Sequence, residues 1–152
     1  MLDRVRESVF GVLGASVDGA RVLDLYAGTG SLGLEALSRG AVEAVFVERD
    51  PQAAAVIEAN VAKVKAGDRS AVVTDGAGRY LGLASPCDLL FFDPPYARLK
   101  DADEREETLD LLLRYVEDVL QPGGHAVFHA PRDMLAVEDL VGLPFAEPRD
   151  WG

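Results

Sequence analysis

The chain has 152 residues, of which 49% are apolar and 27% charged, and its net charge is −11. This length suits one domain with a sizeable core, and the composition is that of an ordinary globular protein. No apolar run reaches the ~20 residues of a membrane-spanning helix, and residues 1–7 lack the basic and then apolar layout of a signal peptide. The single cysteine, Cys87, excludes an internal disulfide, and no Cys/His cluster has the spacing of metal ligands.

These features predict one domain over residues 1–152, in a cytoplasmic monomer without bound metal or membrane contact. The acidic charge bears on possible partners, because such a surface repels polyanions and nucleic-acid-binding proteins usually show a basic face. A small positive patch beside an active site is enough, however, for a nucleic acid to bind. The charge therefore does not exclude a nucleic-acid substrate.

Short apolar runs alternate with helical patterns along the whole chain. Several of the apolar runs carry almost no polar residue, as is typical of strands buried on both faces of a parallel sheet. The alternation predicts an α/β three-layer sandwich with right-handed crossovers. The expected strands are Arg21–Tyr26, Glu43–Glu48, Ser70–Asp75, Asp88–Phe92 and His125–Ala130. The expected helices are Arg4–Leu13, Ser31–Arg39, Pro51–Lys65 and Glu104–Leu120.

Capping residues mark the ends of these helices. Ser31 is expected to cap the helix that it begins, and Gly40 to end it. Asp50 is the expected N-cap of the next helix, with Pro51 at the first helical position. The stretch 121–124, with one proline and two glycines, is expected to end the last helix.

A glycine-rich turn follows the first strand and opens the next helix. Gly28 and Gly30 permit positive φ and let a ligand approach without meeting a Cβ atom. Gly33 lets the helix pack close to the strand. Ligands of open α/β sheets bind at the carboxyl ends of strands, where this turn falls. Glu48 ends the following strand, where its carboxylate can accept hydrogen bonds from both hydroxyls of a ribose.

The same glycine spacing also occurs in dinucleotide-binding proteins, but two carboxylates favour S-adenosylmethionine. Asp24 lies inside the strand, where it would repel a pyrophosphate but suits a cationic sulfonium and ammonium group. Asp75, which closes the third strand, can accept from an adenine amino group. A dehydrogenase would also need a second, substrate-binding half, for which 152 residues leave no room. The expected cofactor-binding residues are Asp24, Tyr26, Ala27, Gly28, Thr29, Gly30, Ser31, Glu48, Arg49, Asp75 and Gly76.

The fourth strand runs directly into Asp93-Pro94-Pro95-Tyr96. The two prolines fix φ and hold the carbonyl groups rigidly. The Asp93 carboxylate and the Pro94 carbonyl can accept the two N–H bonds of an exocyclic amine, which makes its nitrogen nucleophilic towards a sulfonium methyl group. Tyr96 offers a face on which an extruded base can stack. We therefore predict that Asp93, Pro94, Pro95 and Tyr96 are catalytic and that the substrate carries an amino nitrogen.

With these motifs the chain resembles the bacterial 16S rRNA guanine-N2 methyltransferases of the RsmD type. The matching stretches are Asp3–Phe10, Asp24–Gly40 and Asp93–Tyr96, and the resemblance runs from Asp3 to about Ala130. It implies a Rossmann-like class I S-adenosylmethionine-dependent methyltransferase sandwich. It also implies methyl transfer to the N2 amine of a guanine in 16S rRNA of the small ribosomal subunit, with S-adenosylhomocysteine as product.

The family pattern extends beyond this chain at both ends. Family members carry a basic, glycine-containing segment before the first helix and further strands after the region 149–152, so we expect the chain to be trimmed at both ends. Two alternatives remain open. One is an amino methyltransferase acting on adenine N6 of DNA or RNA, and the other is a core that binds the cofactor without activity.

The remaining candidate residues are less specific. Arg4 and Arg6 either reach phosphates of the substrate or form a solvated helix face, and Arg98 and Lys100 lie beside the catalytic motif, where phosphate contact is expected. Asn60 is expected to hydrogen-bond to the backbone. The two histidines, His125 and His129, are interpreted as structural.

Overall fold

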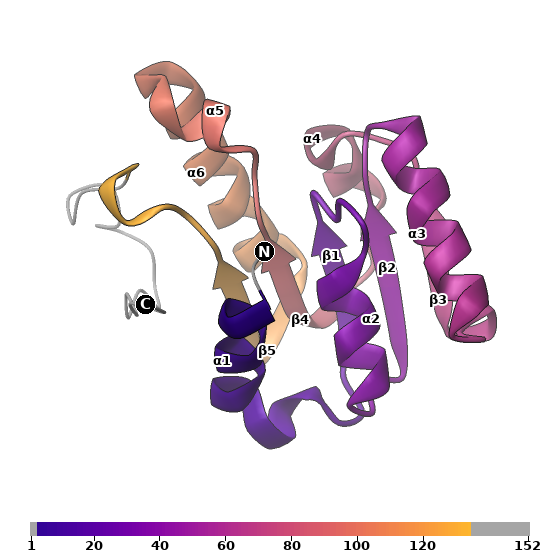
Figure 1. The fold of residues 1–152 in the computed structure, drawn as a ribbon. Helices are drawn as coiled ribbons and strands as arrows, with labels where there is room; N and C mark the ends of the chain where they lie inside the picture. Colours follow the sequence, from indigo (N-terminus) through magenta and orange to yellow (C-terminus); the bar gives the residue numbers. More distant parts are fainter. Residues whose placement is uncertain (1–2, 135–152) are drawn as a thin grey trace.

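The computed structural model describes residues 3–134, which form a five-stranded parallel sheet with helices on both faces (Figure 1). The order of the strands is β3-β2-β1-β4-β5. The strands are β1 (Arg21–Leu25), β2 (Glu43–Val47), β3 (Ser70–Val73), β4 (Cys87–Phe92) and β5 (Leu120–Phe128). The helices are α1 (Asp3–Leu13), α2 (Ser31–Ser38), α3 (Pro51–Lys63), α4 (Ala77–Tyr80), α5 (Tyr96–Lys100) and α6 (Ala102–Asp118). The predicted α/β sandwich is confirmed.

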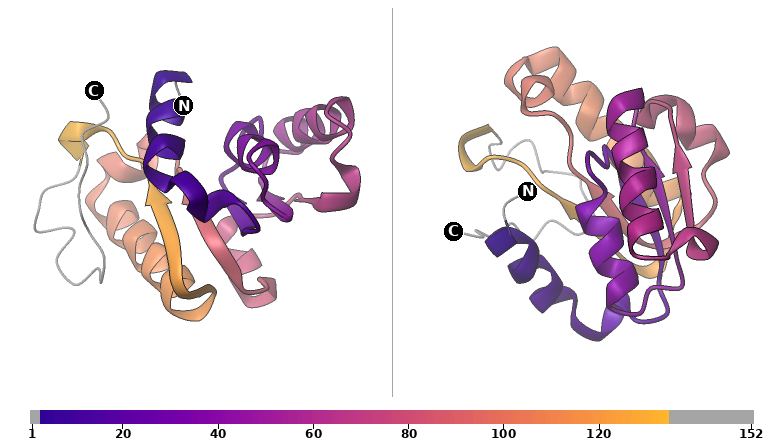
Figure 2. Two further views of the ribbon diagram at one scale, coloured as in Figure 1. Left: turned by 90° about the horizontal axis from the view of Figure 1, so that it is seen from below. Right: turned by 45° about the vertical axis from the view of Figure 1, so that its right-hand side comes forward.

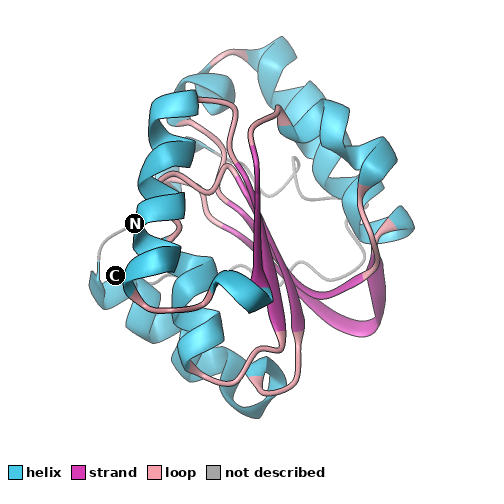
Figure 3. Cartoon of the chain, turned by 90° about the vertical axis from the view of Figure 1, so that its right-hand side faces the viewer, coloured by secondary structure: helices cyan, strands magenta, loops and turns pink. Residues whose placement is uncertain are grey.

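Alternate residues of the buried strands supply two separate cores. Leu89 and Phe91 of β4 face the core under α1, α2 and α3, whereas Leu90 and Phe92 face the core under α4 and α6. This alternation is why the strands read as continuous apolar runs. Figure 2 shows α1, α2 and α3 on the same side of the sheet, and Figure 3 shows the sheet edge-on between its two layers of helices. No helix within residues 3–134 has the length and apolar character needed to cross a bilayer.

The predicted ends of the elements differ from the structure mainly at β5. This strand begins at Leu120, five residues before the predicted start, and it includes the stretch 121–124 that was expected to end the preceding helix. Cys87 pairs with Leu120 and Leu89 with His125, so the proline and glycines fit in an irregularity of the ladder. The predicted strands β1, β2 and β3 each extend one or two residues too far at their carboxyl ends. The expected continuation after 149–152 lies outside the described residues.

The predicted caps have mixed outcomes. Asp50 accepts a hydrogen bond from the Gln52 amide at 3.0 Å, and Gly40 has a φ of +102° after the end of α2, so both are confirmed. Ser31 does not cap α2, because Gly30 occupies the N-cap position with a φ of 81°. The carboxylate of Asp24 instead accepts from the Gly33 amide at 3.0 Å. A buried residue of β1 therefore satisfies the helix terminus that Ser31 was expected to satisfy.

Gly33 lies where α2 crosses β2, and a side chain there would have no room. A Cβ atom would come within 2.4 Å of Cε1 of Phe46, which is fully buried. We expect Gly33→Ala to lower the free energy of unfolding by about 1–3 kcal/mol, because the overpacked core must shift. Urea denaturation measures this change.

Gly11 supplies the matched control for this substitution. It also lies in a helix, α1, but a Cβ atom there would meet nothing within 4 Å. Gly11→Ala should leave the stability unchanged or raise it by up to about 1 kcal/mol, because alanine favours the helix. Equal losses in the two variants would contradict the packing argument.

Candidate active site

The order of the strands places a topological switch point, where open α/β sheets have their ligand crevice, between β1 and β4. From β1 the chain moves outwards to β2 and β3, whereas β4 and β5 lie on the other side of β1. Ligands of open α/β sheets bind at such a switch point, at the carboxyl ends of the strands. The glycine turn leaves β1 on one side of the crevice, and Asp93 leaves β4 on the other. The two predicted motifs are thus brought together.

The glycine turn is held by contacts from two sides, the end of β2 and α3. The Gly28 amide donates to Oε2 of Glu48 at 2.9 Å, and the Ala27 amide donates to the Val47 carbonyl at 3.1 Å. The side-chain amide of Asn60, on α3, donates to the Thr29 carbonyl at 3.0 Å, as expected of a backbone contact. Gly28 has a φ of +59°, and a Cβ atom there would meet nothing within 4 Å. The turn is therefore rigid, with open space beside Gly28.

Asp24 is buried beneath this turn, with 1% of its surface exposed. Burial is the main cause that raises the pKa of its carboxyl group to about 8; the hydrogen bond from Gly33 opposes the rise, and the charges of Asp93 and Glu48 add to it. A carboxyl group in this position lowers its energy when a cation binds nearby or when a proton binds to it.

The raised pKa predicts a pH-dependent stability. Between pH ~4 and the folded-state value of about 8, the folded protein holds a proton that the unfolded chain has lost, so stability falls as the pH rises through this window. Asp24→Asn cannot ionise but keeps a carbonyl oxygen for the Gly33 amide. The free energy of unfolding of the variant, relative to that of the wild type, should therefore rise by several kcal/mol from pH ~5 to pH ~8, since each pKa unit corresponds to about 1.4 kcal/mol. Urea midpoints at both pH values measure this, and an unchanged difference would contradict it.

Tyr26 occupies a strained position at the start of the glycine turn. Its φ of 56° places a bulky residue in the left-handed region, and its ring contacts Phe92 edge-on at 5.2 Å between centroids. Its hydroxyl group is buried close to the guanidinium group of Arg98. Burial raises the pKa of Tyr26, and the nearby Arg98 guanidinium opposes that rise. Such strain persists only where the surroundings enforce it, and it is common at ligand sites.

Asp75 lies in the loop between β3 and α4. Its Oδ1 accepts from the Gly76 amide at 2.7 Å and lies 3.7 Å from Nε of Arg79. Ala77, two residues after Asp75 and the first residue of α4, accepts a hydrogen bond at its carbonyl from the hydroxyl of Tyr115, which is fully buried on α6. This contact joins the start of α4 to α6, so both α6 and β3 help to fix the loop that carries Asp75.

The Asp93-Pro94-Pro95-Tyr96 segment stands at the carboxyl end of β4. Pro94 is buried, whereas Tyr96 is 49% exposed and opens α5. Oδ1 of Asp93 lies 2.9 Å from Nδ1 of His129, the first residue after β5. The centroids of the Tyr96 and His129 rings are 6.3 Å apart. A carboxylate, a histidine and an exposed aromatic ring therefore meet at this side of the crevice.

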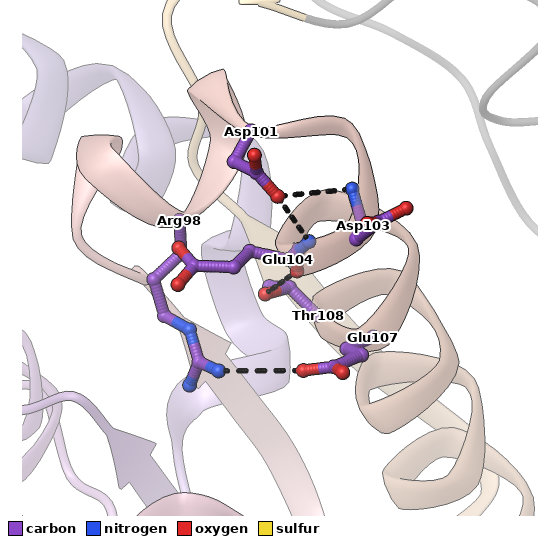
Figure 4. A network of polar contacts seen from close by, with 6 residues as sticks. All are labelled: Arg98, Asp101, Asp103, Glu104, Glu107 and Thr108. Carbon is purple, nitrogen blue, oxygen red and sulfur yellow. Dashed lines mark hydrogen bonds and ion pairs between the residues drawn. The ribbon is translucent and has the colours of Figure 1, made fainter.

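Arg98 is held between α5 and α6, as Figure 4 shows. Its Nη2 atom lies 3.8 Å from Oε2 of Glu107. Asp101, between the two helices, caps α6 by accepting from the amides of Asp103 and Glu104 at 3.1 and 3.0 Å. The guanidinium group near Tyr26 is therefore anchored from α6, while Lys100 is exposed.

The other expected site residues differ in how far they are exposed. Arg4 is exposed on the first turn of α1, whose first residues lie towards the carboxyl ends of β4 and β5 (Figure 1), and Arg6 pairs with Asp3 at 3.0 Å. No group of three or more metal-ligating side chains occurs within the described part of the chain. Thr29 and Arg49 are exposed, Gly30 is buried, and Ala27, Ser31 and Gly76 are half-buried.

Sequence reasoning missed His129 as a site residue and placed it among structural histidines. The predicted strand ran on to Ala130, which left His129 inside it, whereas β5 ends at Phe128. Phe92 pairs with Phe128, so Asp93 and His129 are the next residues of neighbouring strands. Residues that follow parallel strands meet at one edge of the sheet, and this argument would have placed His129 beside Asp93 had the end of β5 been predicted correctly.

The chain is similar to known proteins over most of its length. The chain is 32% identical to YlbH of Bacillus subtilis, which is provisionally named an rRNA methyltransferase, over 99% of this chain and 80% of that protein. It is 35% identical to ribosomal RNA small subunit methyltransferase D of Haemophilus influenzae, over 98% and 72% of the two chains. A solved Escherichia coli structure described provisionally as a methyltransferase is 37% identical, with a TM-score of 0.67, over 79% of this chain. This chain spans 64% of that structure.

The match to a family extends further along the chain than any single motif. The model of the family described as Conserved hypothetical protein 95 matches residues 1–150. It covers both sides of the crevice and the strands that carry them. The chain therefore belongs to this family, the RsmD-type family that its motifs resemble.

Proposed function

We propose that this chain transfers a methyl group from S-adenosylmethionine to the exocyclic N2 amine of a guanine in 16S rRNA of the small ribosomal subunit. One observation carries the proposal: β1, which leads into the glycine turn, and β4, which leads into Asp93 and Tyr96, are parallel neighbours at the switch point of the sheet. The rRNA substrate is supported by the names of the relatives.

The residues around the glycine turn fit S-adenosylmethionine. The open space beside Gly28 leaves room for a ligand against the backbone. Glu48 makes the edge acidic, and a cation bound beside it would favour ionisation of the buried Asp24, which suits a cofactor with positive charge and no phosphate groups. The cofactor supplies a methyl group on a sulfonium, whose C–S bond breaks with its electron pair remaining on sulfur.

Glu48 and Asp75 both have oxygen lone pairs left to accept hydrogen bonds from the cofactor. Glu48 accepts from two amides, those of Gly28 and Asp50, one at each oxygen. A carboxylate has about four acceptor sites, so Glu48 can also accept from ribose hydroxyls. Asp75 uses Oδ1 for the Gly76 amide and can accept from the adenine amino group at Oδ2. Asp24 is buried and acts through its hold on Gly33. Its pKa of about 8 keeps it protonated at neutral pH unless a cation binds nearby.

On the opposite side of the crevice, Asp93 and the Pro94 carbonyl would accept the two N–H bonds of the guanine amine. The carboxylate thereby raises electron density on the nitrogen as the new N–C bond forms, and it is placed to receive the proton that the nitrogen then loses. The exposed ring of Tyr96 would stack on the base. Arg4, Arg6, Arg98 and Lys100 are the side chains proposed to meet RNA phosphates around this edge.

A methyl-transfer assay with labelled S-adenosylmethionine tests this function. The purified chain is incubated with small subunits, with naked 16S rRNA and with DNA, and the modified nucleoside is identified by mass spectrometry. Label in small subunits or rRNA at guanine N2 is the expected result. Label at adenine N6 would replace the substrate assignment, and cofactor binding without transfer to any acceptor would favour an inactive core.

A further inference from the structure

His129 is placed beside the predicted catalytic carboxylate by the backbone as well as by its side chain. Its amide donates to the Phe92 carbonyl at 3.1 Å, which continues the β4–β5 ladder by one step past the pairing of Phe92 with Phe128. Its Nδ1 atom lies 2.9 Å from Oδ1 of Asp93. The position of the ring is therefore fixed by the same ladder that fixes Asp93.

The chemistry of the two groups determines how this contact works. A carboxylate only accepts hydrogen bonds, so Nδ1 carries the hydrogen and donates it. The side chains are 18% and 25% exposed, so water competes weakly for the contact. A hydrogen bond at Oδ1 holds the carboxylate in one orientation and leaves Oδ2 for another donor. The ring of Tyr96, at 6.3 Å from that of His129, lies beside the same carboxylate.

We propose that His129 is a positioning residue for methyl transfer: it holds Oδ1 of Asp93 so that Oδ2 accepts the N–H bond of the substrate amine. The inference rests on the proposed function. His129 forms and breaks no bond to the substrate; it acts through Asp93. Its removal should therefore slow the transfer step while leaving the cofactor site intact, because no contact joins His129 to the glycine turn among the described residues.

Two substitutions separate the hydrogen bond from the packing of the ring. His129→Asn places an amide nitrogen near the position of Nδ1 and so keeps the donor while losing the ring. His129→Phe keeps a ring beside Tyr96 but has no donor. The matched control is His125→Phe, in the same strand, because His125 is exposed. Thermal unfolding of each variant verifies that it is folded.

The readouts are kcat and KM for methyl transfer to the acceptor that the wild type uses, and the Kd of S-adenosylhomocysteine by calorimetry. We expect His129→Phe to lower kcat about 10- to 100-fold, the range for a hydrogen bond to a charged group, with little change in Kd. His129→Asn should restore most of kcat, and His125→Phe should match the wild type.

Three results would overturn the inference, and they differ from a failure of the proposed function. His129→Phe with wild-type kcat would show that the contact is not needed. Equal losses in the Asn and Phe variants would assign the effect to the ring. A loss of cofactor affinity in parallel with kcat would assign His129 a structural role. A wild-type chain that methylates no acceptor would instead refute the proposed function, and the inference with it.

Discussion

Replacing Asp93 by alanine should lower kcat for methyl transfer by about 10²–10³-fold while S-adenosylhomocysteine still binds. The variant loses the acceptor for the substrate amine, and it leaves Nδ1 of His129 without the partner that lies at 2.9 Å in the native protein. The cofactor contacts proposed for the glycine turn, Glu48 and Asp75 do not involve this side chain. The effect should therefore fall on the transfer step and not on the affinity for the cofactor.

Asp88 provides the control for this experiment at the other end of the same strand. Its carboxylate accepts from the Arg21 amide at 2.9 Å, and its side chain is 39% exposed. Asp88→Asn should leave kcat and cofactor affinity unchanged. A single-turnover assay with labelled cofactor and calorimetry with S-adenosylhomocysteine give the two quantities. Retained turnover in Asp93→Ala would show that Asp93 takes no part in methyl transfer. Loss of S-adenosylhomocysteine binding in this variant would assign Asp93 to the cofactor site instead.

The fold could be predicted because its strands are parallel and buried on both faces. Runs such as Leu89–Phe92 are apolar at every position since both core layers need them, and helical patterns separate them. The ends of the strands were harder to predict. Tyr26 continues the apolar run of β1, but its φ of 56° turns the chain into the glycine loop. Composition does not reveal such a turn, because only tertiary contacts enforce it.

The glycines and proline of β5 led to a predicted strand that starts too late, whereas β1 was predicted to be too long. The stretch 121–124 has the composition of a loop, but the neighbouring strand β4 pairs with residues on both sides of it. Because this stretch lies within the ladder, the predicted start of β5 was five residues too late; separately, its predicted end at Ala130 was two residues too late. The error had a functional consequence, since the true end of the strand places His129 beside Asp93.

The candidate site followed from the sequence where each residue directly follows a strand. Glu48 and Asp93 do so, Asp75 lies two residues after β3, and a parallel sheet brings such residues to one edge. Contacts from other elements could not be predicted in this way. Asn60 reaches the Thr29 carbonyl from α3, and Tyr115 reaches the Ala77 carbonyl from α6. These contacts depend on how the helices cross the sheet, which periodicity does not specify.

Gly28→Val should abolish detectable binding of S-adenosylmethionine. In the protein alone, a Cβ atom at this position would meet nothing within 4 Å, so the valine side chain would extend into the space that the proposed cofactor needs. The substitution also strains the backbone, because a β-branched residue disfavours the φ of +59° found there. Loss of binding therefore has two possible causes, the blocked space and the strained turn, and the experiment must separate them.

Gly14→Val separates them, because Gly14 shares the backbone strain but lies away from the carboxyl edge. It has a φ of +50° with nothing within 4 Å of a Cβ atom, and it lies in the turn that follows α1, before β1 begins. Both variants should lose similar stability in urea, whereas only Gly28→Val should lose cofactor binding by calorimetry. Normal binding in Gly28→Val would mean that the cofactor does not approach this turn. Lost binding in both variants would mean that general destabilisation is the cause.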